Sequence, residues 1–193
     1  AFESEYTAIS GCSDPTAMDY NSEAWFDVPC EYYEGDFYVV EENSSELISN
    51  GSEERPYTLI QEALGNASEG QIINIAAGTY IENITWPATN GIKLIGENRE
   101  TTIIDGNDSG SVMYIEAADS TSLMSGFTIT SGDAENGGGI HVLNSEMSFE
   151  DLYVYDNNAS LQGGGMYITG GNNTSPHISV LNSIFGNSKI FSW

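Results

Sequence analysis

The chain of 193 residues has few basic residues: 4 lysines and arginines stand against 29 aspartates and glutamates, a formal net charge of −25. A nucleic-acid-binding surface needs clustered basic residues, so this composition excludes a conventional nucleic-acid binder. The same charge argues against docking on anionic lipid. No apolar run approaches the roughly 18 residues of a membrane span, so we expect no membrane insertion. A basic stretch followed by an apolar segment is also missing, and we expect that any signal peptide has already been removed.

Cysteine and histidine are also scarce. Cys12 and Cys30 are the two cysteines, so a single disulfide can form, and a disulfide implies an oxidising compartment. The histidines are His141 and His177, and neither has a second ligand at metal-binding spacing. His141 alternates with apolar neighbours in a strand-like pattern, so we predict that it is a neutral residue on the surface.

The sequence is rich in the N-glycosylation motif Asn-x-Ser/Thr. A chain with this much asparagine and serine would contain roughly three such motifs by chance. The excess favours a secreted or cell-surface glycoprotein, although chance remains the alternative. The candidate acceptor residues are Asn43, Asn50, Asn66, Asn83, Asn107, Asn158, Asn172 and Asn173.

One pattern is repeated in the second half of the chain. Three glycines followed by a strand-like run begin at Gly137 and again at Gly163, 26 residues later. Apolar residues alternate within each repeat, as Phe127 and Ile129 do, which is the period of a strand. A repeat of this length is typical of a solenoid. The sequence therefore predicts an all-β fold, a parallel β-helix of about five coils between residues 72 and 193, with glycines at its corners.

One amphipathic helix is predicted before the coils, near residues 57–67. Thr58 and Gln61 have the spacing of a capping box. We expect the helix to cover the open apolar end of the first coil, as terminal caps of solenoids do. The predicted division is a disulfide-closed segment at residues 1–34 and a β-helix with its capping helix at residues 35–193. The apolar face of the helix consists of Ile60, Ala63, Leu64 and Ala67.

The N-terminal residues resemble a short disulfide-closed motif of secreted marine microbial proteins, GC-x-DP-x-A-x-NY…A…DDGSC-x-Y. Phe26-Asp-Val-Pro stands where the motif has its acidic stretch. Candidate oxygen ligands for Ca²⁺ in this segment are Asp14, Asp19, Asn21 and Asp27. The alternative is that Asp14 and Asn21 form Asx turns; no other cofactor is expected. The matching residues are Gly11, Cys12, Asp14, Pro15, Ala17, Tyr20, Ala24, Cys30 and Tyr32.

Residues 36–130 resemble right-handed parallel β-helix proteins of the pectin-lyase-like superfamily, and the later coils resemble large secreted and surface β-helix proteins. The resemblance implies a right-handed parallel β-helix. It is carried by Tyr57-Thr-Leu-Ile-Gln-Glu-Ala-Leu, Ile75-Ala-Ala-Gly-Thr-Tyr-Ile-Glu-Asn-Ile, Lys93-Leu-Ile-Gly-Glu-Asn, Thr102-Ile-Ile-Asp-Gly and Ser125-Gly-Phe-Thr-Ile.

The chain departs from the enzymes of this superfamily. Pectin methylesterases carry paired aspartates after the element that corresponds to Gly126-Phe-Thr-Ile. At the following positions this chain has Asn136-Gly-Gly-Gly-Ile-His-Val and Tyr155-Asp-Asn-Asn. Polysaccharide lyases need a strong base beside an acidic-sugar site, and the spread of the four basic residues does not suggest one. We therefore predict that the chain is not an enzyme; if it were one, it would be a polysaccharide lyase or a carbohydrate esterase. The basic residues are Arg55, Lys93, Arg99 and Lys189.

Two functions fit these patterns. The first is an extracellular structural or adhesive module, because residues 183–193 end on apolar residues and lack a polar capping repeat. Such an end favours self-association, or contact with neighbours in a filament through the ends of the β-helix. The alternative is that the sequence is part of a longer chain. The second is a carbohydrate-binding module in which Tyr153, Tyr155 and Tyr167 form an outward aromatic ladder that contacts glycans. The alternative for these tyrosines is cross-strand packing alone.

Overall fold

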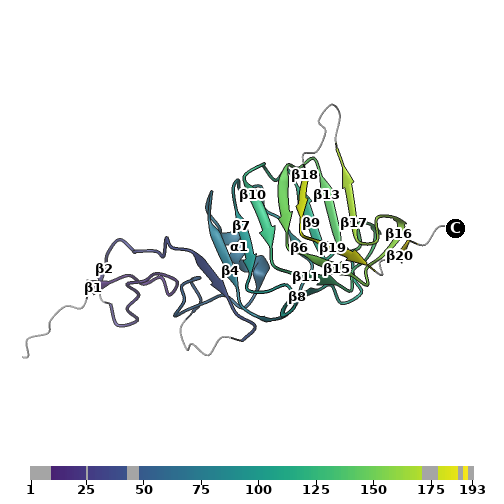
Figure 1. Cartoon of the computed structure of the whole chain (residues 1–193). Coiled ribbons are helices and arrows are strands. Elements are labelled where there is room, and N and C mark those ends of the chain that lie inside the picture. Colours follow the sequence, from purple (N-terminus) through teal and green to yellow (C-terminus); the bar gives the residue numbers. More distant parts are fainter. Residues whose placement is uncertain (1–9, 25, 43–47, 171–177, 187–188, 191–193) are drawn as a thin grey trace, which may run out of the picture.

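The computed structural model describes residues 10–24, 26–42, 48–170, 178–186 and 189–190 and shows a parallel β-helix (Figure 1). Four sheets form the sides of this helix, and the named strands that pair within them are all parallel. The predicted fold class is confirmed. A small parallel pair, β1 (Ser10–Gly11) and β2 (Phe26–Asp27), lies in the N-terminal segment.

The sheets are numbered here in the order in which a coil visits them. The first holds β3 (Phe37–Val39), β4 (Ile72–Ile75), β7 (Lys93–Gly96), β10 (Ser122–Ser125), β14 (Met147–Glu150) and β18 (Ile178–Leu181). The second holds β5 (Gly78–Ile81), β8 (Thr102–Asp105), β11 (Thr128–Thr130), β15 (Tyr153–Tyr155) and β19 (Ile184–Gly186). The third holds β12 (Asp133–Asn136), β16 (Asn158–Gln162) and β20 (Lys189–Ile190). The fourth holds β6 (Ile84–Thr85), β9 (Met113–Glu116), β13 (Ile140–Leu143) and β17 (Met166–Thr169).

Successive coils stack at the predicted period. Ser122 pairs with Met147, 25 residues later, and Ile140 pairs with Met166, 26 residues later. In the described part of the chain, coils begin at β4, β7, β10, β14 and β18. This agrees with the predicted number of coils.

The interior of the β-helix is filled by apolar side chains that stack from coil to coil. Leu94, Met124 and Phe149 are register partners in the first sheet, and none of them is exposed. Removing such columns from water is the main stabilising term for a fold of this kind. Each coil therefore depends on the next one to cover its apolar interior.

Glycines occupy the corner before the fourth sheet, as predicted. Gly137 and Gly163 have φ values of 62° and 68°, in the left-handed region that side chains disfavour. Gly138 allows close approach between coils, because a Cβ there would lie 1.9 Å from the carbonyl oxygen of Asn158. A side chain would strain the local backbone at Gly137 or Gly163, and at Gly138 it would push the stacked corners apart.

The end of the β-helix at β3, called the front, is closed. The outer edge of β3 is covered by residues 51–57, since the backbone N–H of Tyr38 donates to Gly51 and its carbonyl accepts from Tyr57. Helix α1 (Ile60–Asn66) covers the interior and buries Ile60, Ala63 and Leu64 completely. The predicted capping role of the helix agrees with this arrangement.

The start of α1 differs from the prediction. The helix begins at Ile60, its N-cap residue makes no side-chain hydrogen bond, and the predicted capping box of Thr58 and Gln61 is wrong. Glu82 takes over the task, because its carboxylate accepts hydrogen bonds from the backbone N–H groups of Ile60 (2.8 Å) and Gln61 (2.9 Å). The Gln61 side chain is instead bonded to the backbone N–H and C=O of Thr85 in β6.

Candidate functional site

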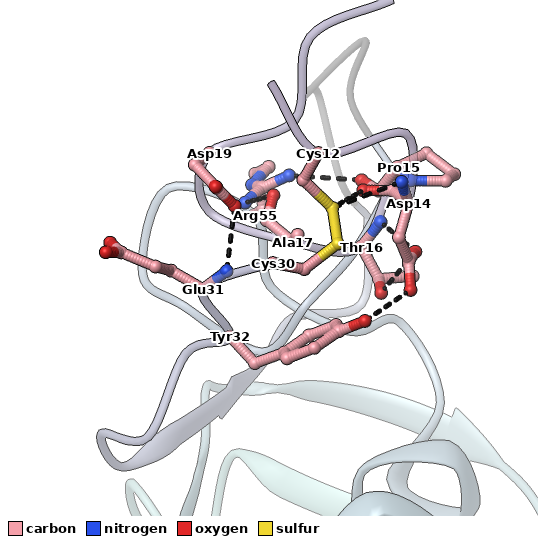
Figure 2. The surroundings of a disulfide bond; sticks show 10 residues. All are labelled: Cys12, Asp14, Pro15, Thr16, Ala17, Asp19, Cys30, Glu31, Tyr32 and Arg55. Atoms are coloured by element: carbon pink, nitrogen blue, oxygen red, sulfur yellow. Dashed lines mark hydrogen bonds between the residues drawn. A yellow bond between two sulfur atoms is a disulfide. The ribbon is translucent and has the colours of Figure 1, made fainter. Parts of the chain in front are cut away.

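The disulfide segment, residues 10–34, is closed by a bond between Cys12 and Cys30, whose Cα atoms are 5.0 Å apart (Figure 2). The predicted disulfide is confirmed and indicates an oxidising environment. Arg55 anchors the segment to the front: its buried guanidinium donates to the carbonyls of Ala17 (3.0 Å) and Pro15 (3.4 Å). The predicted boundary at residue 34 stays a prediction.

The candidate calcium ligands of this segment are occupied by local hydrogen bonds. Asp14 Oδ1 accepts from the backbone N–H (2.9 Å) and hydroxyl (2.8 Å) of Thr16, and Oδ2 accepts from the Tyr32 hydroxyl (2.9 Å) (Figure 2). These hydrogen bonds lower the pKa of Asp14, with the Thr16 backbone bond as the largest cause. The bond from the Thr16 N–H, two residues further on, is the hydrogen bond that defines an Asx turn.

Two of the other candidates also accept hydrogen bonds from backbone N–H groups. Asn21 Oδ1 accepts from the backbone N–H of Glu23 (3.0 Å), and Asp19 Oδ1 accepts from that of Glu31 (2.9 Å). Asp27 lies in β2, and its side chain is outside the described part of the structure. The described residues contain no group of three or more histidine, cysteine, aspartate or glutamate side chains that could hold a metal ion. The Asx-turn alternative therefore fits Asp14 and Asn21, and calcium binding stays a prediction.

The candidate glycosylation residues differ in exposure. Asn66, Asn83 and Asn107 are exposed, and Asn158 is half-buried in β16. Asn50 is 7% exposed and its Nδ2 atom is buried, so this conformation has no room for a glycan there, and its glycosylation stays a prediction. The burial arises because its loop packs on Phe37 and Tyr57, which the local motif cannot reveal. Asn43, Asn172 and Asn173 lie outside the described residues.

The structure divides the three predicted sugar-contact tyrosines between two sheets. Tyr153 and Tyr155 lie together on β15 of the second sheet, with ring centroids 4.6 Å apart and nearly parallel planes. Tyr167 lies on β17 of the fourth sheet, so one ladder of all three does not form. Tyr153 is 38% exposed, and the pair therefore offers ring surface to solvent.

A second aromatic row, which was not predicted from the sequence, runs along the fourth sheet. Tyr114, His141 and Tyr167 are register partners on successive coils, and each neighbouring pair of ring centroids is 5.3 Å apart. Their spacings of 27 and 26 residues match the coil period and could have revealed the row. His141 faces outward, as predicted, but it is half-buried rather than fully on the surface, and burial lowers its pKa. Burial, followed by a hydrogen bond to Glu116, raises the pKa of Tyr114.

Two of the basic residues are engaged in structural contacts. Arg99 Nη1 lies 2.9 Å from Asp151 Oδ1 and also donates to the carbonyl of Asn182 (2.9 Å), which ties the second coil to the last described one. Arg55 is buried under the disulfide segment, and Lys93 is exposed on β7. The Lys189 side chain lies outside the described part of the chain. No basic cluster for acidic sugars forms among the described side chains.

The last described coil leaves apolar side chains exposed. Val180 and Phe185 are the register partners of Phe149 and Val154 one coil earlier. Phe149 and Val154 are completely buried, whereas Val180 and Phe185 are each 42% exposed. We call the exposed residues Val180, Leu181, Ile184 and Phe185 the last-coil edge.

Comparison with known proteins gives limited similarity. No protein-family model matches the chain. Metabotropic glutamate receptor-like protein P of Dictyostelium discoideum is 29% identical over 102 residues, which are 50% of this chain and 7% of that protein. A crystal structure of a pectin methylesterase mutant in complex with a hexasaccharide superposes with a TM-score of 0.47 at 15% identity, over 72% of this chain and 50% of that one. The chain thus spans a small part of the curated relative and half of the solved structure. No helix among the described residues is long and apolar enough to cross a membrane.

Proposed function

We propose that the chain is a non-enzymatic extracellular β-helix module that associates through its last-coil edge with a second copy of itself. The observation that carries the proposal is the contrast between Phe185, 42% exposed, and its fully buried register partner Val154. Everywhere earlier in the β-helix a following coil covers that position. A further coil edge, either of a following segment of a longer chain or of a second copy, offers the same apolar surface and unpaired strand groups. The proposal commits to the second copy.

The two ends of the β-helix differ, and this limits the geometry of assembly. The front is occupied by α1 and by the strand-like pairing of residues 51–57 with β3. A contact between the front of one copy and the last-coil edge of another would have to displace α1. A contact between the last-coil edges of two copies uses the same surface on both. It is therefore isologous and closes as a dimer. Longer filaments would need a further contact, for which the disulfide segment is the remaining candidate.

Other features support an extracellular, non-enzymatic role. The disulfide fits an oxidising compartment, and Asn107 is an exposed candidate for glycosylation. Asn66 and Asn83 are exposed as well, but their Nδ2 groups donate to backbone carbonyls. Arg55 and Arg99 are committed to structural contacts, so neither is available as a catalytic base for polysaccharide cleavage. No cofactor is needed for association, although calcium in the disulfide segment is compatible with it.

Sedimentation equilibrium of the whole chain over a range of concentrations tests the proposal. We expect a monomer–dimer equilibrium that Phe185→Asp shifts to monomer. Ile81→Asp is the matched control, because Ile81 is 68% exposed on β5, away from the edge. A monomer at high micromolar concentration, or equal effects of the two substitutions, would overturn the proposal.

Carbohydrate binding is a second candidate, favoured by the stacked and exposed pair of Tyr153 and Tyr155. Exposed aromatic rings give sugar rings an apolar face on which to pack. A glycan screen followed by titration should then find a saccharide whose binding is lost in Tyr153→Ala. Tyr20→Ala is a suitable control, because Tyr20 has nearly the same exposure (37%) in the disulfide segment. Absence of any saccharide that distinguishes the two variants would exclude this candidate.

A further inference from the structure

The charges of this chain are distributed unevenly along the β-helix. All 29 aspartates and glutamates precede residue 157, whereas residues 157–193, which contain β16 to β20, carry Lys189 as their charged residue. We call residues 157–193 the acid-free stretch. Residues 1–156 have a formal charge of −26 and the acid-free stretch one of +1, which together give the −25 of the whole chain. The acid-free stretch includes the last-coil edge, so the exposed apolar end of the β-helix is also the end without acidic residues.

This distribution makes the last coil suitable for burial in a contact. Burying a carboxylate costs free energy unless it is paired, and the buried core of a protein interface is depleted of charged residues. The carboxylates nearest to β18 lie one coil earlier. Glu150 is the register partner of Leu181, and Asp151 is paired with Arg99 at 2.9 Å. A partner can therefore cover β18 without removing a carboxylate of the last coil from water.

The backbone of β18 directs hydrogen-bonding groups toward this end of the β-helix. The carbonyl of Leu181 accepts a hydrogen bond from the N–H of Asp151 (3.0 Å), so it faces the coil before. The backbone groups of neighbouring residues in a strand point to opposite sides. The N–H and C=O of Val180 therefore point away from the coil before, to the side on which a further strand would pair.

The side chains of β18 add apolar surface on both of its faces. Val180 occupies an inward position, because its register partner Phe149 is completely buried, and yet Val180 is 42% exposed. Leu181 points to the outer face and is 55% exposed. Among the strands of the last described coil, β18 is the longest. Its edge thus combines apolar side chains with backbone groups that are suited to pairing.

We propose that β18 of one copy pairs antiparallel with β18 of a second copy, centred on Val180; this rests on the dimer of the proposed function. The dimer contact uses the same surface on both copies, so a two-fold axis relates them. Two copies of one strand that meet across such an axis run in opposite directions. With Val180 opposite its counterpart, the N–H of each bonds to the C=O of the other, and Ser179 of one copy lies opposite Leu181 of the other.

The charge distribution favours this arrangement over one that brings the fronts together. The front lies at the other end of the first sheet, so the acid-rich parts of the two copies point away from each other in the dimer. The contact contains no ion pair that salt would weaken, and salt screens the repulsion between two copies of charge −25. We expect the dissociation constant to stay the same or to fall between about 20 mM and about 300 mM sodium chloride. A steep rise would indicate a contact held by ion pairs and would overturn the proposal.

Cysteine cross-linking tests the pairing. Ser179→Cys and Leu181→Cys proteins, mixed in equal amounts with oxidised glutathione as the oxidant, should form a mixed disulfide dimer. Residues directly opposite in an antiparallel pair have Cα atoms about 4.5–5.5 Å apart, within the span of a disulfide. Each variant alone should form much less dimer, because its cysteine is offset from its counterpart. The native cysteines do not compete, since Cys12 and Cys30 are bonded to each other. Thr79→Cys, exposed on β5, is the control partner for either variant and should not cross-link.

A carboxylate placed in the acid-free stretch tests the contact independently. Ser179→Glu should weaken the dimer at least about tenfold, because each copy then brings a charge to the contact. Thr79→Glu adds the same charge on β5 and should leave dimerisation unchanged. Unchanged thermal unfolding of each variant separates lost association from lost folding. A dimer in sedimentation that gives no mixed disulfide would overturn this pairing alone, whereas a monomer would overturn the proposed function as well.

Discussion

Glu82 and Ile60 meet at the point where the capping helix joins the β-helix: a carboxylate oxygen of Glu82 accepts the backbone N–H of Ile60 at 2.8 Å. The other oxygen accepts the N–H of Gln61 at 2.9 Å. Glu82 follows β5, so the first coil itself supplies the cap of α1. The negative charge also lies at the positive end of the helix, where it is favourable. Closure of the front is therefore coupled to correct folding of the first coil.

We predict that Glu82→Ala lowers the free energy of unfolding by about 1–2 kcal/mol, since two N–H groups lose their acceptor. Urea unfolding followed by circular dichroism measures the loss. Glu135→Ala is the control, because Glu135 is exposed on β12, and its effect should stay below about 0.5 kcal/mol. If both variants lost the same free energy of unfolding, the hydrogen bonds from α1 to Glu82 would contribute nothing specific to stability.

The coil period was predictable from sequence because each coil repeats the same local demands. Glycine at a left-handed corner and apolar residues at alternate positions are local requirements that every coil repeats. The spacing of Gly137 and Gly163 therefore indicates the coil period directly. The start of α1 was not predictable in this way. Its partner Glu82 lies 22 residues away in sequence, and only the stacking of the first coil brings the two together.

The candidate sites were less predictable than the fold, because a site depends on which side of the coil a residue reaches. Tyr155 and Tyr167 are only 12 residues apart in sequence, about half a coil, and this places them on different sheets. Tyr114 and Tyr167 are far apart in sequence, yet both contact His141. Asn50 shows the same limitation, since a three-residue motif carries no information about the loop packing that buries it.

Acidification should loosen the disulfide segment through Asp14. Hydrogen bonds from the backbone and hydroxyl of Thr16, and from Tyr32, lower the pKa of Asp14 from its ordinary value of 3.8. A group with a lowered folded pKa stabilises the fold above its unfolded pKa, and this contribution is lost as pH falls through the folded pKa. We therefore expect the contact with Tyr32 to persist at pH 4 and to weaken only below about pH 3.8.

Nuclear magnetic resonance of the Thr16 amide and the Tyr32 ring across this pH range measures the transition. Asp14→Asn serves as the control, because its side chain does not titrate and should remove the pH-dependent shifts. A midpoint at or above the ordinary value of 3.8 in the native protein would contradict the prediction.

The buried amide of Asn157 should tolerate no charge. Its Oδ1 accepts from the N–H of Gly132 (2.8 Å), and its Nδ2 donates to the carbonyls of Ile129 (3.0 Å) and Tyr155 (2.9 Å). Asn157→Asp keeps the shape but turns a negative oxygen toward two carbonyl oxygens in a completely buried position. We expect this substitution to lower the free energy of unfolding by about 3–5 kcal/mol at pH 7.

The pH dependence of the loss distinguishes charge from packing. Burial raises the folded pKa of the introduced carboxyl, so its protonated form is favoured in the fold, and the stability lost at neutral pH returns as pH falls. Guanidinium unfolding at pH 7 and pH 4 should therefore show a smaller difference from the native chain at pH 4. Asn158→Asp makes the same change at a half-buried neighbour and should cost much less. If the cost at position 157 were the same at both pH values, the three hydrogen bonds would matter for shape alone and not for the neutrality of the site.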